Sequence, residues 1–289
     1  MNNFDIFVPV HYKDSVKIDF LLESIFRNIH GFDKIYLVTN FNFQSKFKSD
    51  KIIVLNEKEV LDVDFEKIKY RNSWTYQQFL KLFQNVTKDW FLVIDSDCYV
   101  NKHIEIFNGD KFNFLFDGRE NLNLSPFYSF SSKFLNVNRS YNKQFVSEIM
   151  VFNRNIILEI FKNIGLNTVN EMIDYLCENI KRHECLSEFE LYGSYVHSKH
   201  PDLYNYKDIS CFKTGFQDFE FEWDESSIVD LIFQNPDVDL ITYNTYREDI
   251  ANLEWQKGQI ENNDSLNLSE SEKKRRLNNI QKLVLDGRN

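Results

Sequence analysis

The chain has 289 residues, of which 43% are hydrophobic, so it can fill a sizeable core and is not a disordered chain. It holds only 8 Gly and 4 Pro, which excludes collagen-like and low-complexity classes. The formal net charge is −10, and eleven acidic residues against one basic residue fall between Thr214 and Glu254. We interpret this stretch as a solvated acidic surface. A chain without a basic face is not expected to bind nucleic acid.

The first hundred residues alternate between strand patterns and helix patterns. Short apolar runs predict strands at residues 5–10, 34–39, 51–55 and 90–94. Apolar residues at helical spacing predict helices at residues 16–29, ended by Gly31, and at residues 76–86. This alternation indicates an α/β fold with a mostly parallel sheet covered by helices on both faces. Ligands of such sheets bind at the carboxyl ends of the strands.

Beyond Tyr99 the alternation becomes less regular. Strands are predicted at residues 112–116, 148–153 and 240–243, and helices at residues 156–164, 168–180 and 247–259. We expect residues 1–260 to form one body, regular over about 1–100 and less regular over about 101–260.

Residues 261–289 form a polar tail, and we predict that it is helical. Ser269 and Glu272 fit a capping box, and basic residues 273–276 begin the helical pattern that follows. We expect a solvated helix that docks or frays, or at most a peripheral contact with an anionic membrane surface.

The cysteines and the longest apolar run indicate where in the cell the protein is expected. Cys98, Cys177, Cys185 and Cys211 form no C-x-x-C pair, so neither a zinc site nor a disulfide framework is predicted. A strand pattern begins at Phe4, and no apolar run approaches the roughly 20 residues that span a bilayer. We expect a soluble protein without a signal peptide, cytoplasmic or peripheral at the inner face of a membrane.

Asp95-Ser96-Asp97 directly follows the apolar strand at residues 90–94. Two carboxylates one residue apart at a strand end can both face a cleft. Their hard oxygens suit Mg²⁺ or Mn²⁺, which also bind substrate diphosphates. Asp95 and Asp97 are therefore candidate metal ligands, and Asp95 and Ser96 candidate donor contacts. A later histidine, His197 or His200, could add a ligand, and His200 is the one we name. A solvated acidic turn is the alternative.

The exit of the first strand lies beside the same cleft in a parallel sheet. It is a candidate site for the base and ribose of a nucleotide, formed by Val8, Pro9, Val10, His11, Tyr12 and Asp14. Asp14 suits a hydrogen bond to the nucleotide and Tyr12 a stacking contact. The alternative is a plain connection in which Asp14 or Ser15 caps the helix.

Two further segments carry polar side chains suited to a ligand. At the predicted second helix, Arg71, Trp74, Gln78 and Lys81 are candidates for binding a phosphate or a sugar. In the segment 186–195, Glu188 and Glu190 are candidate catalytic carboxylates that could act as a general base. The alternative there is a helix start, with Ser187 as the cap and Glu190 in a capping box.

The strand Val8-Pro9-Val10 and the strand end Asp95-Ser96-Asp97 resemble the GT-A glycosyltransferase superfamily. More narrowly, three motifs in this order resemble a sparsely characterised bacterial family of glycosyltransferases linked to surface-polysaccharide genes. They are Trp74-x-x-Gln77-Gln78-x-Leu80-Lys81-Leu82, Asp95-x-Asp97 and Ser187-Glu188-Phe189-Glu190-Leu191-Tyr192-Gly193. The resemblance covers about residues 4–250 and implies a GT-A-like, Rossmann-type fold. It makes residues 1–100 a nucleotide-binding half and residues 101–260 an acceptor-side half.

The same resemblance implies a nucleotide-sugar donor, a divalent metal, and a carbohydrate or glycolipid acceptor. It maps Asp95 and Asp97 to the metal-binding pair and places Glu188 on the acceptor side. We therefore predict a hexosyltransferase-like enzyme that uses a UDP-sugar, with its stereochemistry open. One alternative is a nucleotidyltransferase, against which the absence of Gly between Val10 and Lys13 counts. Another is a non-catalytic module that binds a nucleotide or a sugar.

Overall fold

The computed structural model describes residues 4–70, 72–116, 125–137, 144–180, 186–213 and 225–242, with residues 274, 277 and 278 of the tail. The chain divides into two units, Met1–Thr245 and Tyr246–Asn289. All the elements named below belong to the first unit. Within the described residues, no helix is both long enough and apolar enough to cross a membrane.

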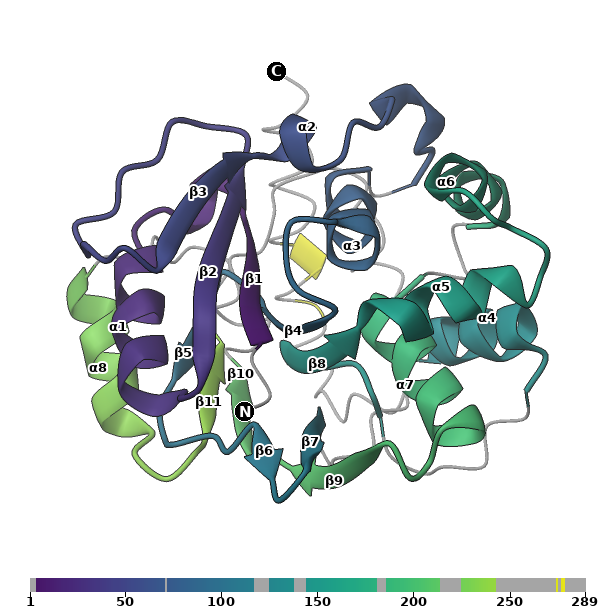
Figure 1. Cartoon of the computed structure of the whole chain (residues 1–289). Coiled ribbons are helices and arrows are strands. Elements are labelled where there is room, and N and C mark those ends of the chain that lie inside the picture. The colour runs from purple at the N-terminus through teal and green to yellow at the C-terminus, as the bar shows by residue number, and fades with distance from the viewer. Residues whose placement is uncertain are drawn as a thin grey trace. The chain divides into compact units, whose positions relative to one another are not determined.

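A five-stranded sheet with the order β3-β2-β1-β4-β8 forms the centre of the first unit (Figure 1). Its strands are β1 (Phe4–Val10), β2 (Phe32–Thr39), β3 (Ile52–Asn56), β4 (Trp90–Ile94) and β8 (Ile149–Asn153). The first four are mutually parallel, and β8 runs antiparallel to β4. The predicted α/β fold with a mostly parallel sheet is confirmed.

Helices α1 (Ile18–Asn28) and α3 (Asn72–Phe83) belong to the two crossovers of this sheet. Because β2 and β4 lie on opposite sides of β1, right-handed crossovers put the two helices on opposite faces of the sheet, as Figure 1 shows. Every residue of β1 is buried, as expected for a central strand covered on both faces. Short turns of helix complete this half: η1 (Tyr12–Asp14), α2 (Glu57–Val60) and η2 (Phe65–Lys67).

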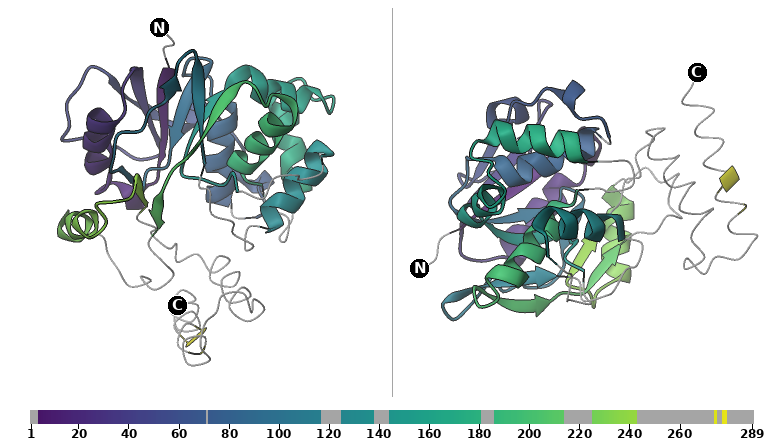
Figure 2. Two further views of the ribbon diagram at one scale, coloured as in Figure 1. Left: turned by 90° about the horizontal axis from the view of Figure 1, so that it is seen from below. Right: turned by 90° about the vertical axis from the view of Figure 1, so that its right-hand side faces the viewer.

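The later part of the chain adds helices and two small sheets. The helices are α4 (Ser125–Leu135), α5 (Arg154–Lys162), α6 (Val169–Asn179), α7 (Glu188–Lys199) and α8 (Glu225–Gln234). Helix α7 contacts α3, α4 and α5, within the group of helices seen from two further directions in Figure 2. One small sheet has the order β10-β11-β5 and the other β6-β7-β9. Their strands are β5 (Cys98–Val100), β6 (Phe107–Asn108), β7 (Lys111–Phe116), β9 (Tyr204–Asp208), β10 (Cys211–Lys213) and β11 (Leu240–Thr242).

The end of the second predicted helix differs from its predicted position because of one side chain. The predicted helix 76–86 begins at Asn72 and ends at Phe83. It ends there because Gln84 Oε1 accepts hydrogen bonds from the N–H groups of Val86 and Thr87, which turns the chain. The predicted helix 247–259 and the tail helix with Ser269 and Glu272 lie outside the described residues.

Candidate functional site

The strand order places a topological switch point at the carboxyl ends of β1 and β4, and we call the region between the connections that leave these two strands the crevice. From β1 the chain runs to β2 and β3 on one side, and then returns across the sheet to β4 on the other side. The connections that leave β1 and β4 therefore diverge. In open parallel sheets, ligands bind at such a switch point. The segments that border it are Tyr12–Asp14, after β1, and Asp95–Asp97, after β4.

The two segments are joined across the crevice by Ser96. Its hydroxyl donates a hydrogen bond of 2.8 Å to Asp14 Oδ2. The other oxygen of Asp14 accepts a hydrogen bond of 3.0 Å from Lys17 Nζ. Both oxygens of Asp14 are thus engaged by the protein itself, although the sequence predicted this residue to contact a nucleotide.

The antiparallel strand β8 brings another carboxylate to the site. The N–H group of Asp95 donates a hydrogen bond of 2.9 Å to the carbonyl oxygen of Glu148, the residue before β8. This contact arises because Ile149 pairs with Ile94 at the last position of β4. The negative charge of Glu148 also acts on both Asp95 and Asp97. Glu148 was not among the residues predicted for the site, because only the pairing of β8 with β4 brings it near these aspartates.

Lys81 on α3 lies at the centre of a buried ionic cluster. Its Nζ is 2.5 Å from Asp95 Oδ1 and 2.6 Å from Glu188 Oε1. The side chains of Lys81 and Glu188 are each 3% exposed, and that of Asp95 is 22% exposed. Burial alone would lower the pKa of Lys81, but the two carboxylates outweigh it and raise the pKa. The lysine therefore stays charged and compensates the two acids.

Helices α3 and α7 contact each other through residues of the 74–82 motif and the 187–193 motif. The N–H group of Glu188 donates a hydrogen bond of 3.2 Å to Gln78 Oε1. Lys81 Nζ lies 4.6 Å from the ring centroid of Phe189. Ser187 caps α7 by accepting a hydrogen bond from the N–H group of Glu190, so this part of the capping-box alternative is present. Gln78, Lys81 and Glu188 thus lie together beside Asp95.

The second carboxylate of the 188–190 pair has a different environment. Glu190 is fully buried, and its Oε2 accepts a hydrogen bond of 3.1 Å from the N–H group of Phe145. Its Oε1 accepts a hydrogen bond from the hydroxyl of Ser194. One turn later, Gly193 lets α7 approach Phe145 closely, since a Cβ atom there would lie 2.4 Å from Phe145 Cγ. Glu190 and Gly193 fix the segment that leads into β8.

Negative charge accumulates around Asp97. Burial raises the pKa of Asp97, and the charges of Asp14, Asp95 and Glu148 raise it further, against the opposing effect of Lys17. Burial likewise raises the pKa of Asp95 to about 6. A cation would relieve this repulsion, and carboxylate oxygens suit Mg²⁺ or Mn²⁺. No group of three or more His, Cys, Asp or Glu in the described residues is arranged to hold a metal. Asp95 and Asp97 offer carboxylate oxygens of the kind that Mg²⁺ and Mn²⁺ take as ligands, and these ions usually complete their coordination with water and phosphate oxygens.

His200 lies elsewhere. It caps the carboxyl end of α7, whose twelve residues begin at Glu188, so the two ends are roughly 18 Å apart. Its Nε2 is 3.0 Å from Glu159 Oε1. The ring of His197 packs against the rings of Phe145 and Tyr206. The structure does not bring His200 together with Asp95 and Asp97.

The remaining candidates at the exit of β1 divide into buried and exposed residues. Val8, Pro9 and Val10 are buried in the strand, so their side chains face the core. Tyr12 is 55% exposed, and its ring centroid lies 4.4 Å from that of His11. Tyr12 is therefore the residue of this group whose side chain is exposed to solvent beside the crevice.

Two candidates at the start of α3 remain. Trp74 is partly buried, and its ring centroid lies 5.7 Å from that of Phe127 on α4. Arg71 lies outside the described residues.

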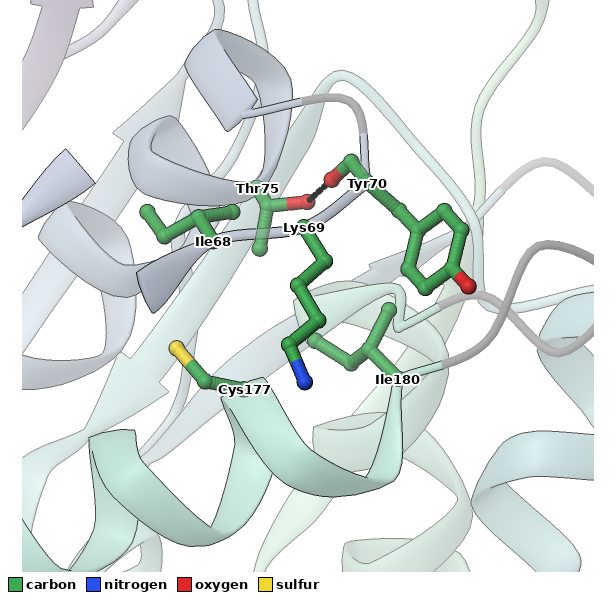
Figure 3. Close-up of a pocket in the computed structure, with 6 residues that line it drawn as sticks. All are labelled: Ile68, Lys69, Tyr70, Thr75, Cys177 and Ile180. Atoms are coloured by element: carbon green, nitrogen blue, oxygen red, sulfur yellow. Dashed lines mark hydrogen bonds between the residues drawn. The ribbon is translucent and has the colours of Figure 1, made fainter. Parts of the chain in front are cut away.

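Figure 3 shows the side chains that line a small hollow beside the start of α3. Its empty space of about 160 Å³ includes open solvent, and it has no room for an enclosed water molecule. Its lining consists of Ile68, Lys69, Tyr70, Thr75, Cys177 and Ile180. There the hydroxyl of Thr75 donates a hydrogen bond to the carbonyl oxygen of Tyr70, which joins the first turns of α3 to the residues before the helix. None of the candidate residues lines this hollow.

The fold and the site together define an α/β protein with acidic residues gathered at the switch point of a mostly parallel sheet. The chain belongs to a family of unknown function, DUF6492, whose sequence profile matches residues 1–219. No curated protein matches it significantly in sequence.

Several solved structures share part of its chain path. The galactosyltransferase LgtC in complex with donor and acceptor sugar analogues aligns with a TM-score of 0.43 at 10% identity, over 83% of this chain and 86% of that one. Mouse xyloside xylosyltransferase 1 aligns with a TM-score of 0.43 at 11% identity, over 84% and 98%. The bifunctional glycosyltransferase WbbM aligns with a TM-score of 0.45 at 13% identity, over 84% of this chain and 46% of that one. At these scores the likeness assigns no activity.

Proposed function

We propose that this protein is a metal-dependent glycosyltransferase. It would move a sugar from a nucleotide sugar, first of all a UDP-sugar, to a carbohydrate or glycolipid acceptor. The supporting observation is the position of Asp95-Ser96-Asp97 at the carboxyl end of β4, beside the exit of β1, where the strand order reverses. A role in surface-polysaccharide synthesis rests on the motif resemblance and is part of the same proposal.

In this proposal Asp95 and Asp97 hold Mn²⁺ or Mg²⁺. The ion would stabilise the negative charge that develops on the departing nucleoside diphosphate. Lys81 fixes the orientation of Asp95 through their contact of 2.5 Å. Tyr12, which is exposed beside the crevice, is the side chain that we propose to stack on the base.

Glu188 is the carboxylate that we propose for the acceptor side. Lys81 links it to Asp95, so it lies next to the proposed metal pair. Because Glu188 Oε1 contacts Lys81, an acceptor hydroxyl would have to approach Oε2 to lose its proton. Glu190, whose oxygens bind Phe145 and Ser194, is proposed as a positioning residue.

Calorimetric titration of UDP, GDP and CDP tests the proposal, with Mn²⁺ and with EDTA. The variants are Asp97→Ala and, as a matched control, Asp174→Ala, which removes an exposed aspartate paired with Lys67. We expect one nucleotide to bind only with metal, and Asp97→Ala but not Asp174→Ala to abolish this binding. If no nucleotide binds the wild-type protein under either condition, the glycosyltransferase assignment is wrong.

A further inference from the structure

Lys17 is a buried cation in an unfavourable position. It is 0% exposed, and it occupies the N-cap position of α1 without a side-chain cap bond. A positive charge at the amino end of a helix is opposed by the helix dipole. Burial of an ammonium group adds a desolvation cost unless the group is paired. Because both effects are unfavourable, a charged Lys17 at this position requires a negatively charged partner.

That partner is Asp14, which connects Lys17 to the turn after β4. Lys17 Nζ lies 3.0 Å from Asp14 Oδ1, and the hydroxyl of Ser96 donates a bond of 2.8 Å to Asp14 Oδ2. Ser96 is itself 2% exposed. The chain of contacts Lys17–Asp14–Ser96 therefore spans the crevice from the start of α1 to the middle of the acidic motif.

The other end of this motif is anchored separately. Asp95 is held by Lys81 and by the carbonyl oxygen of Glu148. Asp95 and Ser96, the two residues before Asp97, are therefore each held by a side chain from outside the turn. Ligand residues that are held in place before a ligand arrives bind it more tightly, because less freedom is lost on binding.

We propose that Lys17, Asp14 and Ser96 form a strut that positions Asp97 for binding a divalent cation and a nucleoside diphosphate. This inference rests on the proposed function. Its residues act through the turn and do not contact the ligand, since Lys17 and Ser96 are buried and both oxygens of Asp14 are engaged. Asp14 is then a support for the metal pair instead of a contact to the nucleotide base.

The test compares Ser96→Ala, Lys17→Met and the double variant by calorimetric titration of Mn²⁺ and of UDP with Mn²⁺. Ser96→Ala removes a single oxygen atom, so it keeps the fold, and circular dichroism checks this. Loss of groups that orient a metal ligand weakens metal affinity by about 10–100-fold, and we expect a loss in this range for each single variant. Because Ser96 and Lys17 both act through Asp14, the double variant should bind Mn²⁺ no more weakly than the single variant that has the lower affinity.

Two controls separate the strut from a general loss of structure. Ser96→Thr keeps the hydroxyl group and should retain most of the affinity. Lys67→Met breaks an exposed lysine–aspartate pair and should leave binding unchanged. Unchanged affinity in Ser96→Ala, or losses that simply add in the double variant, would overturn the strut.

Failure of the proposed function gives a different result. In that case the wild-type protein itself shows no metal-dependent binding of UDP. The strut is then judged by hydrogen exchange of the amides of residues 95–97 in the ligand-free protein. Faster exchange in both Ser96→Ala and Lys17→Met supports the strut, and unchanged exchange refutes it.

Discussion

Lys81 and Glu188 are 107 positions apart in the chain and meet as a buried ion pair, with 2.6 Å between Nζ and Oε1. The same ammonium group contacts Asp95. Lys81 lies on α3, in the regular first part of the chain, and Glu188 begins α7, in the later part. One cation thus connects the proposed metal pair to the proposed acceptor-side carboxylate.

Replacing Lys81 by Met should strongly destabilise the protein. The change leaves Glu188 buried and Asp95 mostly buried, without their counter-charge, and breaking one side of a buried pair costs about 3–5 kcal/mol. Urea denaturation measures the free energy of unfolding. Adding Glu188→Gln to the variant should recover part of the loss. A Lys81→Met protein as stable as the wild type would show that the cluster contributes no stability.

Replacing Glu188 by Gln should separate transfer from donor binding. A general base contributes about 10²–10⁴-fold to the rate, so transfer should fall by that factor. Metal-dependent binding of UDP should remain within about threefold, since Asp95 and Asp97 are intact. The rate is measured as UDP release with a donor and acceptor pair identified by screening. NMR of the product anomer then shows whether transfer inverts. Undiminished transfer in this variant would remove Glu188 as the base.

Replacing Gly193 by Ala should destabilise the protein although alanine favours a helix. A Cβ atom at this position would lie 2.4 Å from Phe145 Cγ, within a buried contact. Overpacking of this kind costs about 1–3 kcal/mol, more than the gain of up to about 1 kcal/mol in helix propensity. Urea denaturation of both proteins shows whether the free energy of unfolding falls or rises with the substitution. Phe145→Leu should cost less in the Gly193→Ala background than in the wild type, because it removes the obstructing ring. Equal costs in both backgrounds would show that the ring is not the obstacle.

The contacts of Glu159 predict a change of stability in acid. Burial alone would raise the pKa of Glu159, but hydrogen bonds from Tyr195 and His200 outweigh it and lower the pKa below 4.5. A lowered folded-state pKa stabilises the protein above the unfolded value, and this contribution is lost as the pH falls through the folded value. Wild type should therefore melt higher than Glu159→Gln above about pH 5, with the difference shrinking below pH 4.5. Melting curves between pH 3 and 7 test this, and a difference that stays constant would contradict it.

The sequence predicted the first sheet well because its strands are continuous apolar runs. Residues 90–94 form β4 as expected, and the polar residues after it mark the carboxyl edge. The pairing of β8 with β4 could not be predicted, since it depends on contacts between distant parts of the chain. For that reason the place of Glu148 beside Asp95 was missed.

Individual site residues were harder to predict than the region. Lys17 begins an amphipathic helix, and only its burial against Asp14 distinguishes it from a surface lysine. Glu188 and Glu190 look alike in sequence, but one turns to Lys81 and the other to Phe145. His200 belongs to a segment near Glu188 in sequence, yet the length of α7 separates the two. Side-chain direction at a helix start depends on the packing of the whole helix.

Strand β8 runs antiparallel to its neighbour β4, and this direction affects which residues near the crevice can change between relatives. The parallel strands β1 and β4 reach the crevice with their last residues, whereas β8 reaches it with its first. Glu148 thus lies beside Asp95 before the chain enters the sheet, and Asn153 leaves the sheet at the opposite edge, where it caps α5. A substitution of Glu148 changes the charge next to Asp95 and Asp97, while the backbone pairing of the strand that follows stays the same. Relatives that differ in ligand preference are therefore expected to vary at this position and to keep the pairing of β8 with β4.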